Sequence, residues 1–227
     1  MKEVLVFSLG GSLIVPGNVN YEYLHKFKKF ILKLTKNYKV VIVTGGGKTA
    51  RKYIEPLIKE KVNEYLISLV GIMSTKLNAR LVSGILNLKY DIPDNLKEVK
   101  KLLDKNNVVV CGALGVQPNM TSDGDAAQIS EYLKAKYFFN LTNVDGLYDK
   151  DPRKYKDAKF IHEVNFNDFI KISNQIKYKA GQHFILDQAA AQIINRAKIK
   201  TLIINGKKLE NVTRFLNNDD YRGTLIS

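Results

Sequence analysis

The segment VLVFSLGGS, residues 4–12, decides the fold because a nearly unbroken apolar run ends there directly at two glycines. Such a run is typical of a strand that is buried on both faces of a parallel sheet, and the glycines end it in a tight turn. The arrangement returns at residues 40–47, where a second apolar run ends at Gly45-Gly46-Gly47. Two strands of this kind, separated by a helical pattern, predict an α/β fold.

Strand-like and helix-like segments alternate along the rest of the chain, which indicates a mainly parallel sheet with helices on both faces. No internal repeat or low-complexity linker interrupts this pattern, so we interpret residues 1–227 as one domain. We expect strands at 4–9, 40–44, 108–111, 137–141 and 201–204, and helices at 24–34 (with Asn20 as N-cap), 49–59, 64–86, 96–104, 126–133 and 186–197.

The chain is strongly basic, with a formal net charge of +14 from 36 Lys and Arg against 22 Asp and Glu. Such a charge can indicate a nucleic-acid surface. The lysines are instead scattered, as Lys26, Lys29 and Lys33 are along one helical segment, and no basic motif is interleaved with aromatic residues. We therefore do not expect nucleic acid as a partner, although binding to RNA stays open to a gel-shift test.

Composition also excludes some kinds of site. Cys111 is the only cysteine, so neither an internal disulfide nor a cysteine-based zinc site can form. No apolar run approaches the roughly 20 residues that a membrane span needs. The N-terminus shows no export signal. We therefore expect a cytoplasmic protein that does not enter a membrane.

Three loops that follow strands are candidates for binding phosphate: Gly10-Gly11-Ser12, Gly45-Gly46-Gly47 and Thr121-Ser122-Asp123. The carboxyl ends of parallel strands line one edge of the sheet, where ligands bind. Glycine lets phosphate oxygens approach backbone N–H groups, and a following helix turns its free amides toward the same anion. The spacing excludes a Walker A loop, because that motif needs glycine at the position of Ile42.

The segment Asp145-Gly146-Leu147-Tyr148-Asp149-Lys150-Asp151-Pro152 combines a turn sequence with several carboxylates and one aromatic ring. It could seat a nucleotide, with Tyr148 against the base and Asp151 near a hydroxyl group. The alternative is a tight surface turn with a solvated acidic cluster.

Together these segments resemble the amino acid kinase family, and most closely its archaeal-type UMP kinases. The matching residues span nearly the whole chain, and the string Thr142-Asn143-Val144-Asp145-Gly146-Leu147-Tyr148 through Asp151-Pro152 is the most specific of them. The other matches are Gly10-Gly11-Ser12-Leu13, Thr44 through Arg51, Gly71-Ile72, Leu77-Asn78-Ala79, Gln117-Pro118 with Thr121-Ser122, Lys179-Ala180-Gly181 and Leu186-Asp187.

The resemblance implies a three-layer α/β/α sandwich with a mainly parallel central sheet. It also implies a homohexamer that uses ATP with Mg²⁺ and phosphorylates UMP to UDP in pyrimidine nucleotide biosynthesis.

The resemblance also implies roles for individual residues. Gly11, Ser12, Gly47 and Arg51 would face the ATP phosphates, and Thr142, Tyr148 and Asp151 would hold the adenosine. The UMP site would comprise Gly46, Ser68, Val116, Gln117, Pro118, Asn119, Met120, Thr121 and Ser122.

Two positions depart from the family pattern. Ser8 stands where many relatives have a lysine that neutralises the transferring phosphate, and Ser68 stands where UMP kinases have an aspartate that grips the ribose. We hypothesise that Lys48 or Lys179 supplies the missing positive charge beside Arg51, the main candidate for catalysis.

Two alternatives follow from these departures. One is another phosphotransferase of the family, such as isopentenyl phosphate kinase, which relies on a histidine early in the acceptor region. No histidine lies between His25 and His162 here, which disfavours that activity. The other alternative is a family member that binds nucleotides without catalysis.

Overall fold

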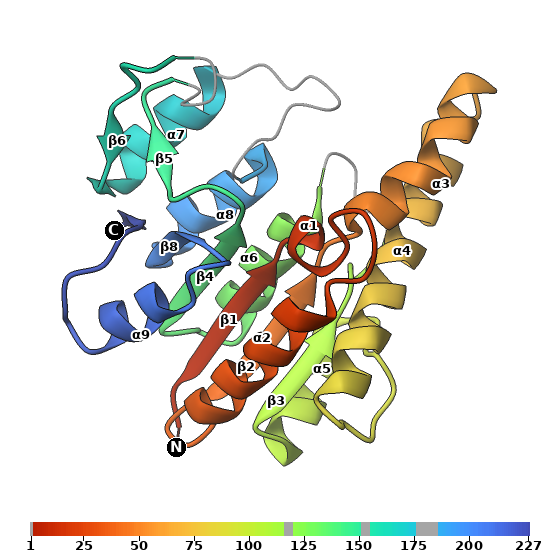
Figure 1. Cartoon of the computed structure of the whole chain (residues 1–227), viewed down its shortest axis with the longest axis horizontal. Helices are drawn as coiled ribbons and strands as arrows, with labels where there is room; N and C mark the ends of the chain where they lie inside the picture. The colour runs from red at the N-terminus through yellow and green to blue at the C-terminus, as the bar shows by residue number, and fades with distance from the viewer. Residues whose placement is uncertain (1, 116–119, 151–154, 176–185) are drawn as a thin grey trace.

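A computed structural model describes residues 2–115, 120–150, 155–175 and 186–227. Within these ranges seven strands form one sheet in the order β3-β2-β1-β4-β8-β9-β7 (Figure 1). The first five strands of this order pair in parallel, whereas β9 runs antiparallel to β8. The strands are β1 (Val4–Leu9), β2 (Lys39–Thr44), β3 (Val108–Cys111), β4 (Tyr137–Thr142), β7 (Glu163–Val164), β8 (Thr201–Asn205) and β9 (Thr224–Ile226).

Helices cover both faces of this sheet, so the expected three-layer α/β/α sandwich is confirmed (Figure 1). Among the described residues they are α1 (Gly11–Ile14), α2 (Tyr21–Leu34), α3 (Gly47–Lys59), α4 (Glu64–Ile85), α5 (Leu96–Lys105), α6 (Ser122–Tyr132), α7 (Phe166–Gln175), α8 (Gln188–Ala197) and α9 (Glu210–Leu216).

The apolar run of β1 is continuous because its two faces pack in two separate cores. Side chains alternate across a strand, so Leu5 and Phe7 join one core while Val6 joins the other. The first core also contains Phe27 of α2, and the second contains Ile129 of α6. The strand is therefore held at the centre of the sheet by apolar burial on both of its faces.

Side-chain caps mark the starts of several helices. Asn20 accepts a hydrogen bond from the Tyr23 backbone N–H, as predicted, and Asn63 and Asn95 cap α4 and α5 in the same way. Such caps satisfy backbone donors that a helix leaves free at its first turn.

Helices α3 and α4 (residues 47–85) pack against each other and extend beyond the sheet as an arm, at the right of Figure 1. No residue of α3 is buried. The sequence correctly predicted both helices but gave no sign that this pair would project from the body.

Several short elements are absent from the sequence prediction. The segment interpreted as a nucleotide-seating turn contains β5 (Leu147–Tyr148), which pairs antiparallel with β6 (Phe160–Ile161). Helices α1, α7 and α9 and strands β7 and β9 were also not predicted. In the described part of the chain, no helix has the length and apolar character needed to cross a membrane.

Candidate active site

The first two glycine loops meet where adjacent strands β1, β2 and β4 end (Figure 1). The Gly45 N–H donates to the Leu9 carbonyl at 3.0 Å, which ties the loop after β2 to the end of β1. The Gly10 N–H donates to the Leu141 carbonyl at 3.1 Å, which ties the loop after β1 to β4. The predicted convergence of these loops at one edge of the sheet is therefore confirmed.

The backbones of these two loops interlock so closely that side chains are excluded between them. An ideal Cβ placed on Gly11 would lie 2.1 Å from the Gly47 nitrogen, and one on Gly47 would lie 2.2 Å from the Gly11 carbonyl oxygen. Gly47 also has φ of +62°, a conformation that side chains disfavour. Loop-to-loop packing thus requires both glycines, whatever the ligand that the edge binds.

Asn78 of α4 fixes the second loop from the side of the arm. Its Nδ2 donates to the carbonyls of Gly45 at 2.7 Å and Gly46 at 3.2 Å. Asn78 itself is buried, with 2% of its surface exposed. The sequence analysis quoted Asn78 only as part of a matching string and missed this role, because nothing local in the sequence shows a contact 33 residues away.

The third loop approaches the second loop through Ser122. An ideal Cβ on Gly45 would lie 3.4 Å from the Ser122 Oγ. Thr121 donates from its N–H at 3.0 Å and from its hydroxyl at 2.5 Å to one carboxylate oxygen of Asp187. The other Asp187 oxygen accepts from the Ala190 N–H and caps α8. Asp187 therefore holds the starts of α6 and α8 together.

Asp123 lies directly behind these loops and is held by both central strands. The Ser8 hydroxyl donates to its Oδ1 at 2.5 Å, and Asn140, which pairs with Ser8 in the sheet register, also hydrogen-bonds the carboxyl group. Burial raises the pKa of Asp123 to about 7, and the nearby Asp187 and Asp125 add to this rise. Ser8 therefore contacts a carboxyl group whose pKa is raised to about 7.

Asp125 lies two residues further along α6 and supports the chain that leads into the predicted acceptor loop. Its Oδ1 accepts from the Leu114 N–H at 3.0 Å, and its side chain is 3% exposed. Burial raises its pKa to about 6, with a further contribution from Asp187. Sequence reasoning included Asp123 only as the last residue of a candidate phosphate-binding loop and assigned no role to Asp125.

Of the predicted adenosine residues, the structure describes Thr142, at the end of β4, and Tyr148, in β5. The Thr142 carbonyl accepts from the Gly206 N–H at 2.7 Å. Tyr148 is half-buried in β5, and its ring meets the Phe160 ring edge-on at 5.3 Å between centroids. These two residues lie at either end of the turn that joins β4 to β5.

Lys48 and Arg51 stand at the start of α3, next to the interlocked glycines. Both side chains are exposed, and within the described ranges neither forms a hydrogen bond or ion pair. Ser12 is half-buried at the start of α1, and Ser68 is exposed on α4. The predicted residues Val116, Gln117, Pro118, Asn119, Asp151 and Lys179 lie outside the described residues.

Comparison with known proteins places these loops in a family context. The family model described as "Amino acid kinase family" matches residues 3–205. The chain is 38% identical to the uridylate kinase of Methanococcus aeolicus, over 98% of this chain and 99% of that one. It is 37% identical to the uridylate kinase of Thermoplasma volcanium, over 95% of this chain and 94% of that one.

Solved structures show the same relationship. The crystal structure of uridylate kinase from Archaeoglobus fulgidus superposes with a TM-score of 0.86 at 33% identity, and each chain is covered completely. The UMP kinase from Ureaplasma parvum has a TM-score of 0.82 at 22% identity, covering 100% of this chain and 99% of that one, which shows a shared fold.

Proposed function

This chain belongs to the amino acid kinase family, and we infer that within the family it is a uridylate kinase. It transfers the γ-phosphoryl group of ATP to UMP and releases UDP and ADP. The observation that carries this inference is that uridylate kinases match the chain over almost its whole length at 33–38% identity. We treat residues 1–227 as a single kinase domain.

The ATP phosphates would lie over the interlocked loops. Backbone N–H groups of Gly11 and Gly47 and the hydroxyl of Ser12 would face them, because no side chain blocks an anion from the glycine backbone. Arg51 and Lys48 start the adjoining helix with side chains that have no partner in the described part of the chain, so both are available to neutralise phosphate charge. Lys179 would add a third positive charge.

The acceptor would enter from the side of the arm and the third loop. Gly46 and Ser68 would face it from the arm, and the segment from Val116 to Ser122, with Met120 and Thr121 among its described residues, would close around it. Adenosine would contact Thr142 and Tyr148 across the β4–β5 turn, with Asp151 near the ribose. The two nucleotides would then meet end to end above β1.

The reaction needs little acid–base chemistry. A UMP phosphate oxygen is already anionic near neutral pH, so no general base has to activate it. Catalysis then depends on aligning donor and acceptor and on neutralising charge in a loose transition state. This agrees with an edge that is rich in backbone amides and cations.

We also propose Mg²⁺ as a companion of ATP. Among the described residues no group of three or more metal-binding side chains could hold an ion alone. Mg²⁺ at phosphoryl-transfer sites is held mainly by substrate phosphates with one or two carboxylates, so a complete protein cage is not needed. Asp123, which is hydrogen-bonded to Ser8 at the end of β1, would contribute one such carboxylate. The bound ion would neutralise charge on the phosphates.

A coupled assay of ADP release tests the proposed function. UMP, CMP, dUMP and isopentenyl phosphate would each be offered with ATP, with and without Mg²⁺. We expect UMP to give the highest kcat/KM. A preference for isopentenyl phosphate would establish the family alternative. ATP binding in calorimetry with no turnover of any acceptor would establish a non-catalytic binding protein.

The assembly and location of the enzyme are further proposals. We propose a homohexamer, supported by the apolar side chains that the α3–α4 arm exposes, of which Met73 is 69% and Leu77 61% exposed. A kinase of pyrimidine nucleotide biosynthesis would work in the cytoplasm, where ATP and UMP are available.

A further inference from the structure

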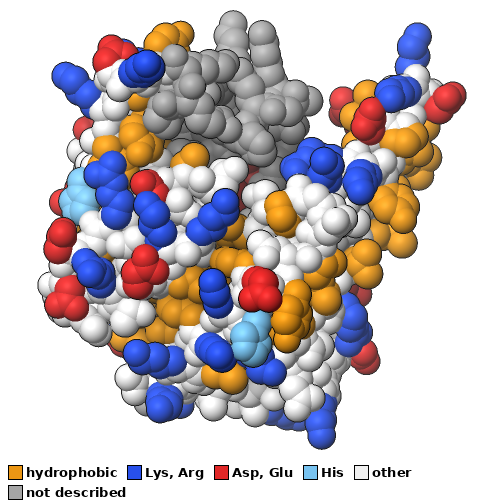
Figure 2. All heavy atoms as spheres, in the orientation of Figure 1, with side chains coloured by type: hydrophobic (Ala, Val, Ile, Leu, Met, Phe, Trp, Pro, Cys, Tyr) orange, Lys and Arg blue, Asp and Glu red, His pale blue; other side chains and the backbone are white. Residues whose placement is uncertain are grey.

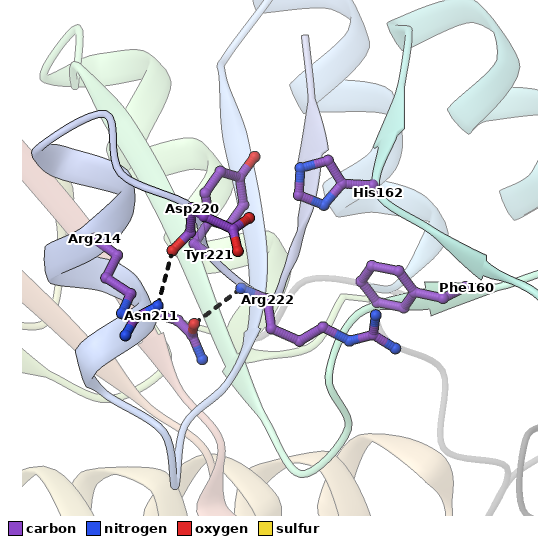
Figure 3. Close-up of a pocket in the computed structure, with 7 residues that line it drawn as sticks. All are labelled: Phe160, His162, Asn211, Arg214, Asp220, Tyr221 and Arg222. Atoms are coloured by element: carbon purple, nitrogen blue, oxygen red, sulfur yellow. Dashed lines mark hydrogen bonds between the residues drawn. The ribbon is translucent and has the colours of Figure 1, made fainter.

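A cavity of about 410 Å³ lies away from the glycine loops, between the β6 strand and the chain that joins α9 to β9 (Figure 3). Its volume falls in the range of small-molecule sites. None of the residues assigned to ATP or UMP lines it. The lining residues are Phe160, His162, Asn211, Arg214, Asp220, Tyr221 and Arg222.

Two arginines, Arg214 and Arg222, supply positive charge and hydrogen-bond donors to the lining of this cavity. Arg214 donates from one guanidinium nitrogen to the Asp220 carbonyl at 3.3 Å. Arg222 lies with its Cζ 3.7 Å above the centre of the Phe160 ring, and among the described residues its ion-pair partner is Asp145, with a carboxylate oxygen 4.0 Å away. Each guanidinium has five N–H donors, so most of the donors on both remain available to a ligand.

The carboxylate of Asp145 accepts hydrogen bonds from Asn205 and Lys208. Although partial burial opposes the effect, the pKa of Asp145 lies below its usual range because Asn205 and Lys208 hydrogen-bond its carboxylate. Lys208 approaches it to 3.2 Å, closer than Arg222 does. Arg222 adds to the lowered pKa of Asp145 through its charge alone, while its guanidinium group stacks on Phe160.

Aromatic rings supply the rest of the wall. The rings of His162 and Tyr221 lie 4.9 Å apart, and Phe215 packs edge-on against Tyr221 at 5.1 Å behind it. Buried Asn211 fixes the loop by accepting from the Arg222 N–H at 2.9 Å (Figure 3). Asp220 is the one carboxylate among the lining residues, so the two arginines leave the wall with a net positive charge.

We propose that this cavity is a second ligand site, and that it takes a small phosphorylated compound with a planar ring. Arginine forks bind phosphate oxygens through paired hydrogen bonds, and the ring of the ligand would stack on the aromatic wall. Because Phe160 also packs against Tyr148, the occupant contacts the same hairpin that is assigned to adenosine.

The test uses phenyl phosphate as the probe, with phenol and inorganic phosphate for comparison. The chain has no tryptophan, so Tyr221→Trp places a single fluorescent reporter in the cavity. Calorimetry on the unaltered protein gives a second readout. We expect saturable binding of phenyl phosphate that weakens at least about tenfold in Arg214→Gln and in Arg222→Gln, since each loses a charge-assisted contact.

Arg196→Gln is the matched control, because this exposed arginine on α8 does not line the cavity. It should bind the probe as the parent does. Equal affinity in the parent and in both cavity variants, or no heat at millimolar phenyl phosphate, would overturn the proposal. Binding is read without any phosphoryl transfer, so the outcome is independent of the proposed kinase activity.

Discussion

Two carboxyl groups near the edge of the sheet, those of Asp123 and Asp125, have pKa values that the protein itself raises. The carboxyl groups of Asp123 and Asp125 are both desolvated, and their hydrogen-bond partners within the described residues are a hydroxyl and an amide for Asp123 and a backbone N–H for Asp125. Desolvation favours the neutral form of a carboxyl group, which explains their raised pKa values. Asp123 thus keeps a proton until about neutral pH, and a cation such as phosphate-bound Mg²⁺ would favour its release.

We expect Asp125→Asn to stabilise the protein near neutral pH. The pKa of Asp125 is raised to about 6, whereas the unfolded chain ionises this group near pH 4. Folded-state stability therefore falls as pH rises from about 4 to about 6, and asparagine removes that loss while still accepting from Leu114. The gain should approach about 3 kcal/mol at pH 7 and vanish below about pH 4. Urea unfolding of both proteins across this range measures it, and a pH-independent difference would contradict the raised pKa.

We expect Arg51→Ala to lower kcat about ten- to a hundredfold. A charge-assisted hydrogen bond to phosphate contributes roughly 1.5–3 kcal/mol, and the loss applies in the transition state. Lys52→Ala is the control, since Lys52 is the next exposed cation on α3 and has no assigned role. Steady-state kinetics with ATP and UMP compare the two. Equal turnover in both variants would remove Arg51 from the site.

At the scale of secondary-structure elements, the proposed phosphate site depends on the close contact between the backbones of Gly11 and Gly47. The loop that begins α1 and the loop that begins α3 meet through Gly11 and Gly47, so the position of each helix start depends on the other. A change at either glycine should therefore alter both the fold and the phosphate site.

Gly47→Ala tests this dependence. A left-handed conformation costs a side chain roughly 1–2 kcal/mol, and the added methyl group would also displace Gly11. We expect at least about 2 kcal/mol of lost stability and, by displacing phosphate-facing amides, at least a tenfold loss of ATP affinity. Urea unfolding and ATP calorimetry measure the two effects.

Gly84→Ala is the matched control, because Gly84 lies in helix α4 with open space where a Cβ would stand. Removing a helical glycine should raise stability by about 1 kcal/mol and leave ATP binding unchanged. If Gly47→Ala bound ATP as tightly as Gly84→Ala, the loop would not be the phosphate site.

The strands and long helices could be predicted because their signals are local. Apolar runs ending at glycine marked β1 and β2, and Asn20 marked the start of α2. The β5–β6 hairpin could not be predicted from sequence, because each strand has only two residues and both are bonded by a residue far along the chain. Thr224, in β9, accepts from the Leu147 N–H and donates to the Ile161 carbonyl.

The candidate site also has parts that the sequence predicts and parts that only the folded structure shows. Its glycine loops were visible in sequence because strand-to-helix turns have a recognisable composition. The contact between Ser8 and Asp123 spans 115 residues and appears only when β1 and α6 are brought together. Sequence therefore predicted that the glycine loops meet at one edge of the sheet, whereas the contacts of the buried carboxyl groups could be seen only in the folded structure.

At the scale of the whole molecule, the α3–α4 arm is the feature that a monomer does not explain. Figure 2 shows apolar side chains along its outer surface. A projecting helix pair with such a surface is typical of a contact between protein chains. The large apolar side chains exposed on it are Tyr53, Ile58, Tyr65, Leu66, Met73 and Leu77.

We expect this surface to be covered by a second copy of the chain, so a single charge placed within it should separate the subunits. Met73→Glu and Leu77→Glu each set a carboxylate among apolar side chains, and burying it unpaired in an interface would cost several kcal/mol. Light scattering after gel filtration should give the parent a multiple of its 25.7 kDa chain mass and give both variants a smaller mass.

Leu32→Glu, at a 46% exposed leucine on α2 outside the arm, should keep the parental mass and so control for a general effect of added charge. A parent that elutes as a monomer, or arm variants that keep the parental mass, would show that another surface or none joins the subunits. If the arm variants dissociate and their kcat for UMP also falls, the contact supports the helices that carry Arg51 and Ser68. Unchanged kcat in dissociated subunits would instead show that each chain builds its active site alone.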